Sequence, residues 1–258
     1  MSITTIATHV QPGSPTDVEK RLAPALTVAE AFGAYLATLV FAIDGSDAPE
    51  AATAAQVGEL AARRGVRGEV RPRTSFAYGA GEVFADQARV SDLAVVSLDL
   101  ALGMPGRLLL STVAFSSGRP VLMVPEASGM PRMPKRVLVA WDASPAAARA
   151  VAGALPFIRQ ADETIVATVT EDTALRAGQS GIELTHLLAR HGVSASFAAV
   201  RGDGRGALAS LTECARERSA DLLVLGIVRH SPVHDLVFGS ATAALFQGAA
   251  GLPCLIAA

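Results

Sequence analysis

A glycine-containing stretch near the end of the chain, residues 226–240, has the residue types of an anion-binding loop. Gly226 follows an apolar run, and Gly239 and Ser240 precede a helical pattern. Glycine lets the backbone approach a phosphate closely, and the N–H groups at a helix start point toward an anion. Arg229 is the exception, because it puts a long side chain inside this loop. The stretch therefore predicts a phosphate-binding loop that Arg229 modifies.

A second candidate motif, Gly-x-Gly-x-x-Ala at residues 202–207, formally matches the dinucleotide fingerprint. That fingerprint belongs to the first strand–helix turn of its unit, with an acidic residue about 20 positions further on. Here the motif follows the third strand of its half, and Glu217 and Asp221 precede the next strand. We therefore favour a tight turn beginning at Gly202, with N–H groups near a nucleotide, over a NAD site.

The same region also holds the ingredients of a metal site and of a hydrolytic triad. His230 and His234 have the spacing of a helical metal pair, but Pro232 lies between them. Ser231, His234 and Asp235 lack the Gly-x-Ser-x-Gly elbow of a hydrolase. We favour exposed loop residues over zinc binding or hydrolysis, and no Walker motif supports NTPase chemistry of that type.

Composition narrows the class of protein. The chain has 258 residues, half of them hydrophobic, with a net charge of −2 and scattered Lys and Arg residues. This pattern argues against a nucleic-acid surface, which would show a basic stripe. No apolar run approaches the roughly 18 residues of a membrane span, and the start of the chain lacks the pattern of a signal peptide. We therefore expect no membrane association and a cytoplasmic location.

The chain divides at residues 125–134, where three prolines and a glycine interrupt regular structure. On each side, short apolar strands alternate with longer Ala-rich helices. Near-continuous apolar strands suit a parallel sheet that is covered on both faces. We therefore expect two similar domains, 1–125 and 135–258.

Each half contains five expected strands in the same order. The strands are 3–8, 35–41, 66–71, 93–97 and 121–124, then 136–141, 164–170, 194–201, 222–225 and 254–257. The second-half helices are expected at 144–160, 184–191 and 205–218, with a fourth from 240. We align His9 with Asp142, and Ser97 with Gly226. Because the first half lacks the acidic residue and the glycine, nucleotide binding is expected only in the second half.

An Asp after strand one and Gly-x2-Gly-x9-Gly-Ser/Thr after strand four resemble the universal stress protein family. The matching residues are Asp142, Gly226, Gly239 and Ser240, together with the Gly-Asp turn that begins at Gly202. The second half resembles the family well and the first half loosely. The resemblance implies an α/β fold of two flavodoxin-like, adenine nucleotide alpha hydrolase-like domains. Each domain would contain a five-stranded parallel sheet with helices on both faces.

The resemblance also implies roles for individual residues. In ATP-binding members of the family, the strand-one Asp faces the adenine and the residue that ends strand two packs near the ribose. These roles fall to Asp142 and Val169. The glycine loop and the Ser/Thr hold the phosphates, and these roles fall to Gly226, Gly239 and Ser240.

Arg229 takes the place of the second glycine in this pattern. Its side chain either fills the groove and blocks a triphosphate, or pairs with a phosphate through its guanidinium. In the family, loss of this glycine accompanies weak or absent ATP binding. ATP is the candidate cofactor that the resemblance implies, but we expect Arg229 to oppose its binding.

The resemblance implies a cytoplasmic, non-enzymatic stress-response protein whose second domain senses or binds an adenine nucleotide. One alternative is a ligand-free scaffold in which both sites are degenerate. Another is a nucleotide hydrolase or nucleotidyl transferase that uses Asp142 and Asp203 to hold a metal. Family domains pair through their last strands, so the resemblance also implies an internal pseudo-dimer through 121–124 and 255–257, and a further homodimer.

Overall fold

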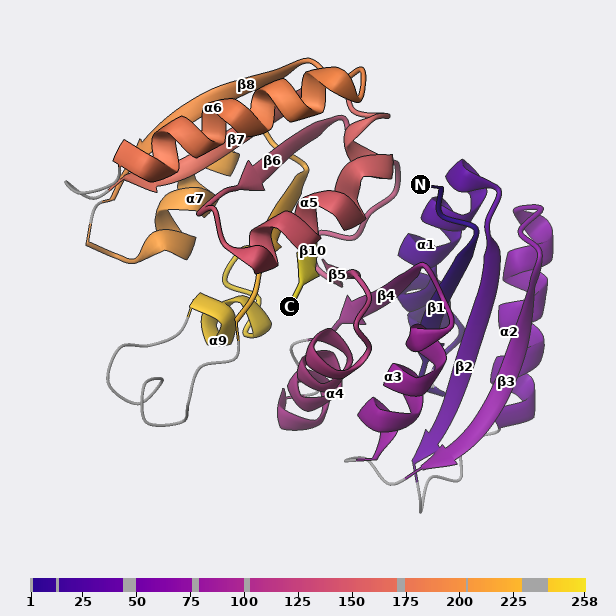
Figure 1. The fold of residues 1–258 in the computed structure, drawn as a ribbon. Helices are drawn as coiled ribbons and strands as arrows, with labels where there is room; N and C mark the ends of the chain where they lie inside the picture. The colour runs from indigo at the N-terminus through magenta and orange to yellow at the C-terminus, as the bar shows by residue number, and fades with distance from the viewer. Residues whose placement is uncertain are drawn as a thin grey trace. The chain divides into compact units, whose positions relative to one another are not determined.

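The chain folds as two compact α/β units, Met1–Met133 and Pro134–Ala258 (Figure 1). The computed structural model describes residues 2–12, 14–43, 50–75, 79–99, 103–170, 175–202, 204–228 and 241–258. The α/β class expected from the sequence is confirmed. Each unit is described by itself below.

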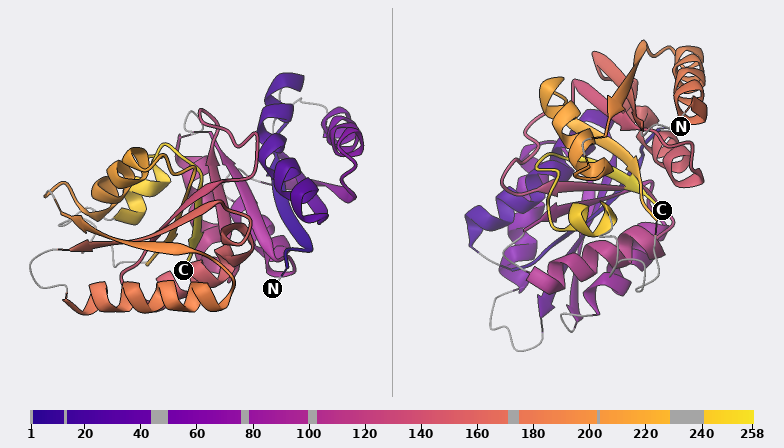
Figure 2. Two further views of the ribbon diagram at one scale, coloured as in Figure 1. Left: turned by 90° about the horizontal axis from the view of Figure 1, so that it is seen from above. Right: turned by 90° about the vertical axis from the view of Figure 1, so that its left-hand side faces the viewer.

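The first unit contains a parallel sheet in the order β3-β2-β1-β4-β5. Its described strands are β1 (Thr5–Val10), β2 (Tyr35–Ile43), β3 (Gly68–Ser75), β4 (Leu93–Leu98) and β5 (Val121–Pro125). The helices are α1 (Pro15–Phe32), α2 (Glu50–Arg63), α3 (Ala80–Arg89) and α4 (Gly103–Ser116). Helices α1 and α2 pack together, as do α3 and α4, and the two pairs cover opposite faces of the sheet (Figures 1 and 2).

The second unit repeats this arrangement in the order β10-β9-β6-β7-β8. Its described strands are β6 (Arg136–Ala140), β7 (Glu163–Thr170), β8 (Ala195–Arg201), β9 (Leu222–Gly226) and β10 (Cys254–Ala257). The helices are α5 (Pro145–Ile158), α6 (Leu175–Arg190), α7 (Ala207–Glu217) and α9 (Ala241–Phe246). The usual right-handed crossovers place α5 and α6 on one face, and α7 and α9 on the other.

The strands of each sheet form the core of its unit. Every residue of β5 and β10 is buried, and so are the first four residues of β9. This matches the near-continuous apolar runs of the sequence, since helices cover both faces of a parallel sheet.

The first helix of each unit begins with the same Ser-Pro pair. Ser14 caps α1, and its side chain accepts a hydrogen bond from the N–H of Asp17. Ser144 caps α5 in the same way through the N–H of Ala147, at 3.1 Å. A capping serine satisfies a free N–H of the first turn, and proline suits the first helical position because it needs no N–H partner.

The first strand lies two residues later than the 3–8 predicted from the sequence. The Asp92 carboxylate accepts hydrogen bonds from the N–H groups of Thr4 and Thr5, at 2.8 and 3.0 Å. The strand then continues through Val10, which pairs with Val40 on β2. Helix α6 is also longer than predicted, beginning at Leu175.

The hydrogen bonds from the backbone to Asp92 have a counterpart in the second unit. There the Asp221 carboxylate accepts hydrogen bonds from the N–H groups of Lys135 and Arg136, at 3.0 and 2.8 Å. Each carboxylate thus fixes the entry to the central strand of its unit. Partial burial raises the pKa of Asp92, but the hydrogen bonds from Thr4 and Thr5 lower it, and the net shift is downward.

Replacing Asp92 by alanine is expected to destabilise the first unit by about 2 kcal/mol, because two N–H groups lose a charged acceptor. Urea denaturation followed by tyrosine fluorescence measures this, since the two tyrosines, Tyr35 and Tyr78, belong to the first unit. Asp86→Ala is the matched control, because Asp86 is exposed and pairs with Arg89 on its own helix. Equal losses of stability in both variants would contradict the proposed role of the Asp92 hydrogen bonds.

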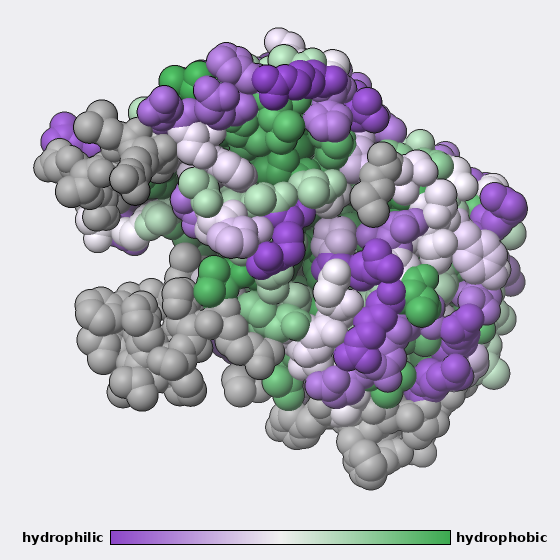
Figure 3. All heavy atoms as spheres, viewed as in Figure 1, coloured by the Kyte–Doolittle hydropathy of each residue, from purple (hydrophilic) through white to green (hydrophobic). Residues whose placement is uncertain are grey.

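No helix in the described part of the chain is long and apolar enough to cross a membrane. Figure 3 shows apolar surface in the area that α6 occupies in Figure 1. Helix α6 exposes Ile182 and Leu187, while Leu184 and Leu188 face the core. This helix therefore combines a buried apolar face with some exposed apolar surface.

Candidate functional site

A cavity of about 260 Å³ lies in the second unit, where the strand order reverses between β6 and β9. In open α/β sheets, ligands bind at the carboxyl ends of the strands beside such a reversal. The cavity is bordered by the ends of β6, β7 and β9, the turn after β6, and the first half of α7. Its lining residues are Ala140, Trp141, Asp142, Ala167, Thr168, Val169, Ala207, Leu208, Leu211, Leu225 and Gly226.

The lining is largely apolar, and Asp142 supplies its charge. The volume is just under the roughly 300 Å³ at which typical small-molecule pockets begin. Apolar walls with a carboxylate at the edge suit a flat ring that carries N–H or O–H donors. A nucleoside has this chemistry.

Asp142 lies in a tight turn between β6 and α5. Its Oδ1 accepts a hydrogen bond from the N–H of Ser144 at 2.9 Å, which closes the turn. Ala143 has a φ of 62°, in the left-handed region that residues other than glycine seldom adopt. The turn thus fixes the carboxylate at the edge of the cavity through one of its two oxygens.

Gly226 ends β9, where the first turn of α5 approaches the strand most closely. A Cβ atom added to Gly226 would collide with the backbone N of Ala147 and lie 2.5 Å from the carbonyl carbon of Ala146. Close helix–strand packing therefore already requires glycine at this position, whether or not phosphate binds there.

The cavity brings together three of the predicted site residues, Asp142, Val169 and Gly226. Gly202 is not among the lining residues, and its N–H donates to the carbonyl of Thr170 at 3.5 Å. The other predicted residues, Arg229, Gly239 and Ser240, lie outside the described residues, as do Asp203 and the motif histidines His230 and His234. In the described part of the chain, no group of three His, Cys, Asp or Glu residues could hold a metal.

Sequence reasoning missed the α7 wall of the cavity and the residues next to Asp142. Leu208 and Leu211 are spaced like ordinary core residues of a helix, so no sequence signal separated them from the core. Trp141 and Thr168 fall within the expected strands 136–141 and 164–170, which by themselves gave them no role in the site. The sequence indicated a role for Trp141 and Thr168 only through their position next to Asp142 and Val169, which were predicted site residues.

Strand register gives the counterpart of this cavity in the first unit. Ile6 pairs with Leu93 on β4, and Val137 pairs with Leu222 on β9. Counting onward, His9 corresponds to Ala140, and Gln11 corresponds to Asp142. The alignment of His9 with Asp142 is therefore wrong, because the turn before the capping serine is one residue longer in the first unit. The alignment of Ser97 with Gly226 agrees with the same register.

Aromatic rings fill the corresponding position in the first unit. On β2, Phe41 corresponds to Val169, because Leu36 pairs with Ile6 and Thr164 pairs with Val137. On α3, Phe84 corresponds to Leu211 through the shared pattern of buried residues along α3 and α7.

In this ring cluster, the His9 ring contacts both phenylalanine rings. The His9 centroid lies 5.1 Å from that of Phe84 and 6.2 Å from that of Phe41. Both phenylalanines are completely buried. The rings therefore occupy space that smaller side chains leave open in the second unit.

His9 is the polar member of the ring cluster. Its two ring nitrogens are buried and have no hydrogen-bond partner among the described residues. Burial, and to a lesser extent the positive charge of Arg21, lowers the pKa of His9 from 6.5 to about 4. The imidazole is thus neutral at pH values near 7 and acts as a packing group.

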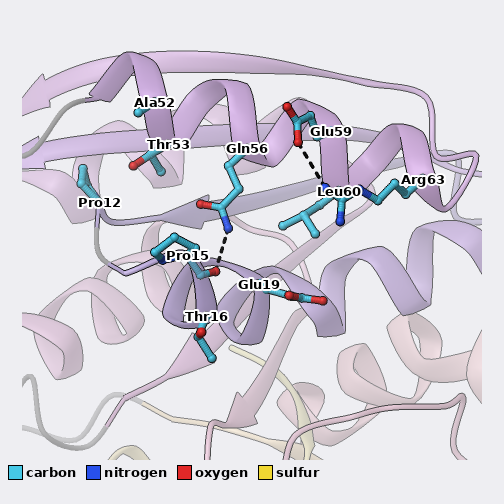
Figure 4. Close-up of a pocket in the computed structure, with 10 residues that line it drawn as sticks. All are labelled: Pro12, Pro15, Thr16, Glu19, Ala52, Thr53, Gln56, Glu59, Leu60 and Arg63. Carbon is cyan, nitrogen blue, oxygen red and sulfur yellow. Dashed lines mark hydrogen bonds and ion pairs between the residues drawn. The ribbon is translucent and has the colours of Figure 1, made fainter.

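A larger and more open hollow, of about 670 Å³, lies between α1 and α2 of the first unit (Figure 4). Its lining residues are Pro12, Pro15, Thr16, Glu19, Ala52, Thr53, Gln56, Glu59, Leu60 and Arg63. Gln56 donates to the carbonyl of Pro15 at 2.7 Å across the hollow, and Arg63 pairs with Glu59 along α2. It contains none of the predicted site residues, so the smaller cavity remains the candidate site.

The second unit matches a protein-family model, and solved structures share the fold of the whole chain. Residues 133–256 match the model of the universal stress protein family. No curated protein matches the chain.

Solved structures resemble the chain over both units. A universal stress protein from Archaeoglobus fulgidus DSM 4304 is 13% identical with a TM-score of 0.65, and the match covers 97% of each chain. A functionally unknown protein from Pseudomonas aeruginosa PAO1 is 17% identical with a TM-score of 0.65, covering 99% of this chain and 92% of that chain. A universal stress protein in complex with cAMP is 24% identical with a TM-score of 0.40, covering 49% and 99%. The first two likenesses show that the fold of the whole chain is shared.

Proposed function

We propose that this chain is a member of the universal stress protein family, whose model matches its second unit, and that this unit binds an adenine nucleotide. The protein would act as a cytoplasmic, non-enzymatic stress-response protein that senses the nucleotide. The observation that carries the proposal is the cavity at the strand-order reversal, which Asp142, Val169 and Gly226 all line. Its apolar walls would hold the base and the ribose, and the carboxylate would accept a hydrogen bond from the nucleoside.

Binding is tested by calorimetry with ATP and Mg²⁺, cAMP and adenosine. Trp141 lines the cavity and is the one tryptophan of the chain, so its fluorescence provides a second, independent readout. Asp142→Asn is expected to weaken binding about tenfold, because a charged acceptor is lost. Asp162→Asn, which changes an exposed carboxylate of the same unit, is the matched control and should leave binding unchanged. No binding of any of the three ligands, even after Arg229→Gly, would refute the proposal.

Arg229 decides which ligands fit. We propose that its side chain opposes the triphosphate, so ATP should bind Arg229→Gly more tightly than the wild type. Adenosine has no phosphate and should bind both proteins alike. If ATP binds the wild type and Arg229→Ala abolishes this binding, the arginine pairs with phosphate and the blocking role is excluded.

Filling the cavity with the rings of the first unit should abolish binding. The double variant Val169→Phe/Leu211→Phe places phenyl rings where the first unit has Phe41 and Phe84. The expected loss of affinity is at least about 100-fold, or about 2.7 kcal/mol, because the rings and the ligand compete for one space. Leu187→Phe is the control, since it makes the same change on the exposed side of α6. Unchanged affinity in the double variant would place the ligand elsewhere.

The alternative function is a nucleotide hydrolase with Asp142 among its metal-holding carboxylates. Steady ATP turnover that Asp142→Ala abolishes would establish that alternative. Binding without turnover supports the non-enzymatic proposal.

A further inference from the structure

Trp141 and Thr168, both beside the cavity, form a support for the Asp142 turn. The N–H of Trp141 donates to the carbonyl of Ala167 at 2.8 Å. Its own carbonyl accepts a hydrogen bond from the Thr168 hydroxyl at 2.9 Å. The backbone immediately before Asp142 is thus tied to β7 on both sides of the residue.

The indole of Trp141 is tied to a third element. Its Nε1–H donates to the Ser180 hydroxyl on α6 at 3.0 Å. Helix α6 approaches the sheet closely here, since a Cβ atom added to Gly181 would collide with the Phe197 ring and lie 3.3 Å from the Thr168 hydroxyl. Ser180 therefore sits on a closely packed segment of the helix and provides a fixed partner for the indole.

This support leaves one oxygen of Asp142 available to a ligand. The N–H of Ser144 occupies Oδ1, and no described residue donates to Oδ2. An ionised carboxylate only accepts hydrogen bonds. A ligand with an N–H or O–H group at this edge would satisfy it, and the direction of Oδ2 depends on the turn.

In the first unit, the positions that correspond to Trp141, Asp142 and Thr168 all carry other residue types. By strand register, Val10 stands in place of Trp141, Gln11 in place of Asp142, and Val40 in place of Thr168. The indole support and the hydroxyl support are thus absent in the unit whose cavity position is filled by rings. This joint difference associates Trp141 and Thr168 with the open cavity.

We propose that Thr168 and Trp141 are positioning residues that aim the free oxygen of Asp142 at a bound nucleoside and thereby strengthen its binding. The inference rests on the proposed function of the second unit. Thr168 acts through the backbone of residue 141, and Ser180 acts through its indole. Neither hydroxyl needs to touch the ligand for this role.

The test compares Thr168→Val with Thr164→Val. Both threonines lie on β7 and are buried, but the Thr164 hydroxyl has no partner among the described residues. Valine is close in shape to threonine, so each change replaces a hydroxyl by a methyl group. We expect Thr168→Val to weaken adenosine, cAMP and ATP binding by about 5- to 10-fold, and Thr164→Val to leave it unchanged. Measurements use the wild-type background, or Arg229→Gly if only that variant binds.

A double-mutant cycle separates positioning from a purely structural role. In the Asp142→Asn background, Thr168→Val should cause no further loss, because the group it orients is already changed. Ser180→Ala should shift the fluorescence maximum of Trp141 and follow the same non-additive pattern. Additive losses, or equal affinities of wild type and Thr168→Val, would overturn the positioning role while leaving the proposed function intact. A background that binds none of the ligands would overturn the proposed function, and this role with it.

Discussion

Replacing Gly226 by alanine is expected to destabilise the second unit by at least about 3 kcal/mol, whether or not a ligand is present. The new methyl group would meet the backbone of Ala146 and Ala147 rather than a movable side chain. The first turn of α5 would have to shift, and overpacking of this kind costs about 1–3 kcal/mol or more. The measurement is urea denaturation followed by Trp141 fluorescence, because the tryptophan belongs to the second unit.

Ser97→Ala is the matched control, at the corresponding register position of the first unit. There α1 leaves room for a side chain, and the Ser97 hydroxyl donates to the carbonyl of Arg21 at 2.6 Å. Loss of that hydrogen bond should cost about 1 kcal/mol, measured by tyrosine fluorescence. If Gly226→Ala folds as stably as the wild type and weakens only ATP binding, the glycine serves the phosphates and the packing explanation is wrong.

Acid should weaken the first unit through His9. Its pKa is lowered from 6.5 to about 4 in the folded unit, so the unfolded chain binds the proton more readily between these values. The free energy of unfolding therefore falls as the pH drops from 6.5 toward 4, and the full loss is about 3 kcal/mol. Above pH 6.5 the residue is neutral in both states and contributes no pH dependence.

His9→Leu isolates this effect from the carboxylates that titrate at lower pH. Leucine fills similar space without unpaired ring nitrogens, so the variant should gain about 1 kcal/mol at neutral pH. Its stability should then depend much less on pH between 6.5 and 4 than that of the wild type. Parallel stability–pH curves for the two proteins would show that folding does not lower the pKa of His9.

The α/β class and the alternation of strands and helices along the chain could be predicted because they depend on local features. Apolar runs, breakers and the Ser-Pro helix starts are all visible within a few residues of one another. The position of Asp142 after the first strand followed from the same features. Its inclusion in a cavity depends on how the turn, β7 and α7 pack together.

The correct alignment of His9 and the existence of the ring cluster both depend on contacts between segments that are far apart in the sequence. Neither could therefore be predicted from local patterns. The extra residue in the turn after β1 becomes clear only when strand register is known. His9, Phe41 and Phe84 come from β1, β2 and α3, and each alone has the pattern of an ordinary buried residue. A local pattern contains no information about three rings that meet across such separations.

The ring cluster has a consequence for the lifetime of the protein in a cell. A ligand stabilises only a fold that has room for it, by an amount that grows with the ratio of ligand concentration to Kd. The ring cluster fills the position in the first unit that corresponds to the cavity. A ligand in the cavity would therefore protect the second unit against proteases and leave the protease resistance of the first unit unchanged. Degradation beginning in residues 134–258 would then slow as the ligand accumulates, and the amount of intact chain would follow the ligand level.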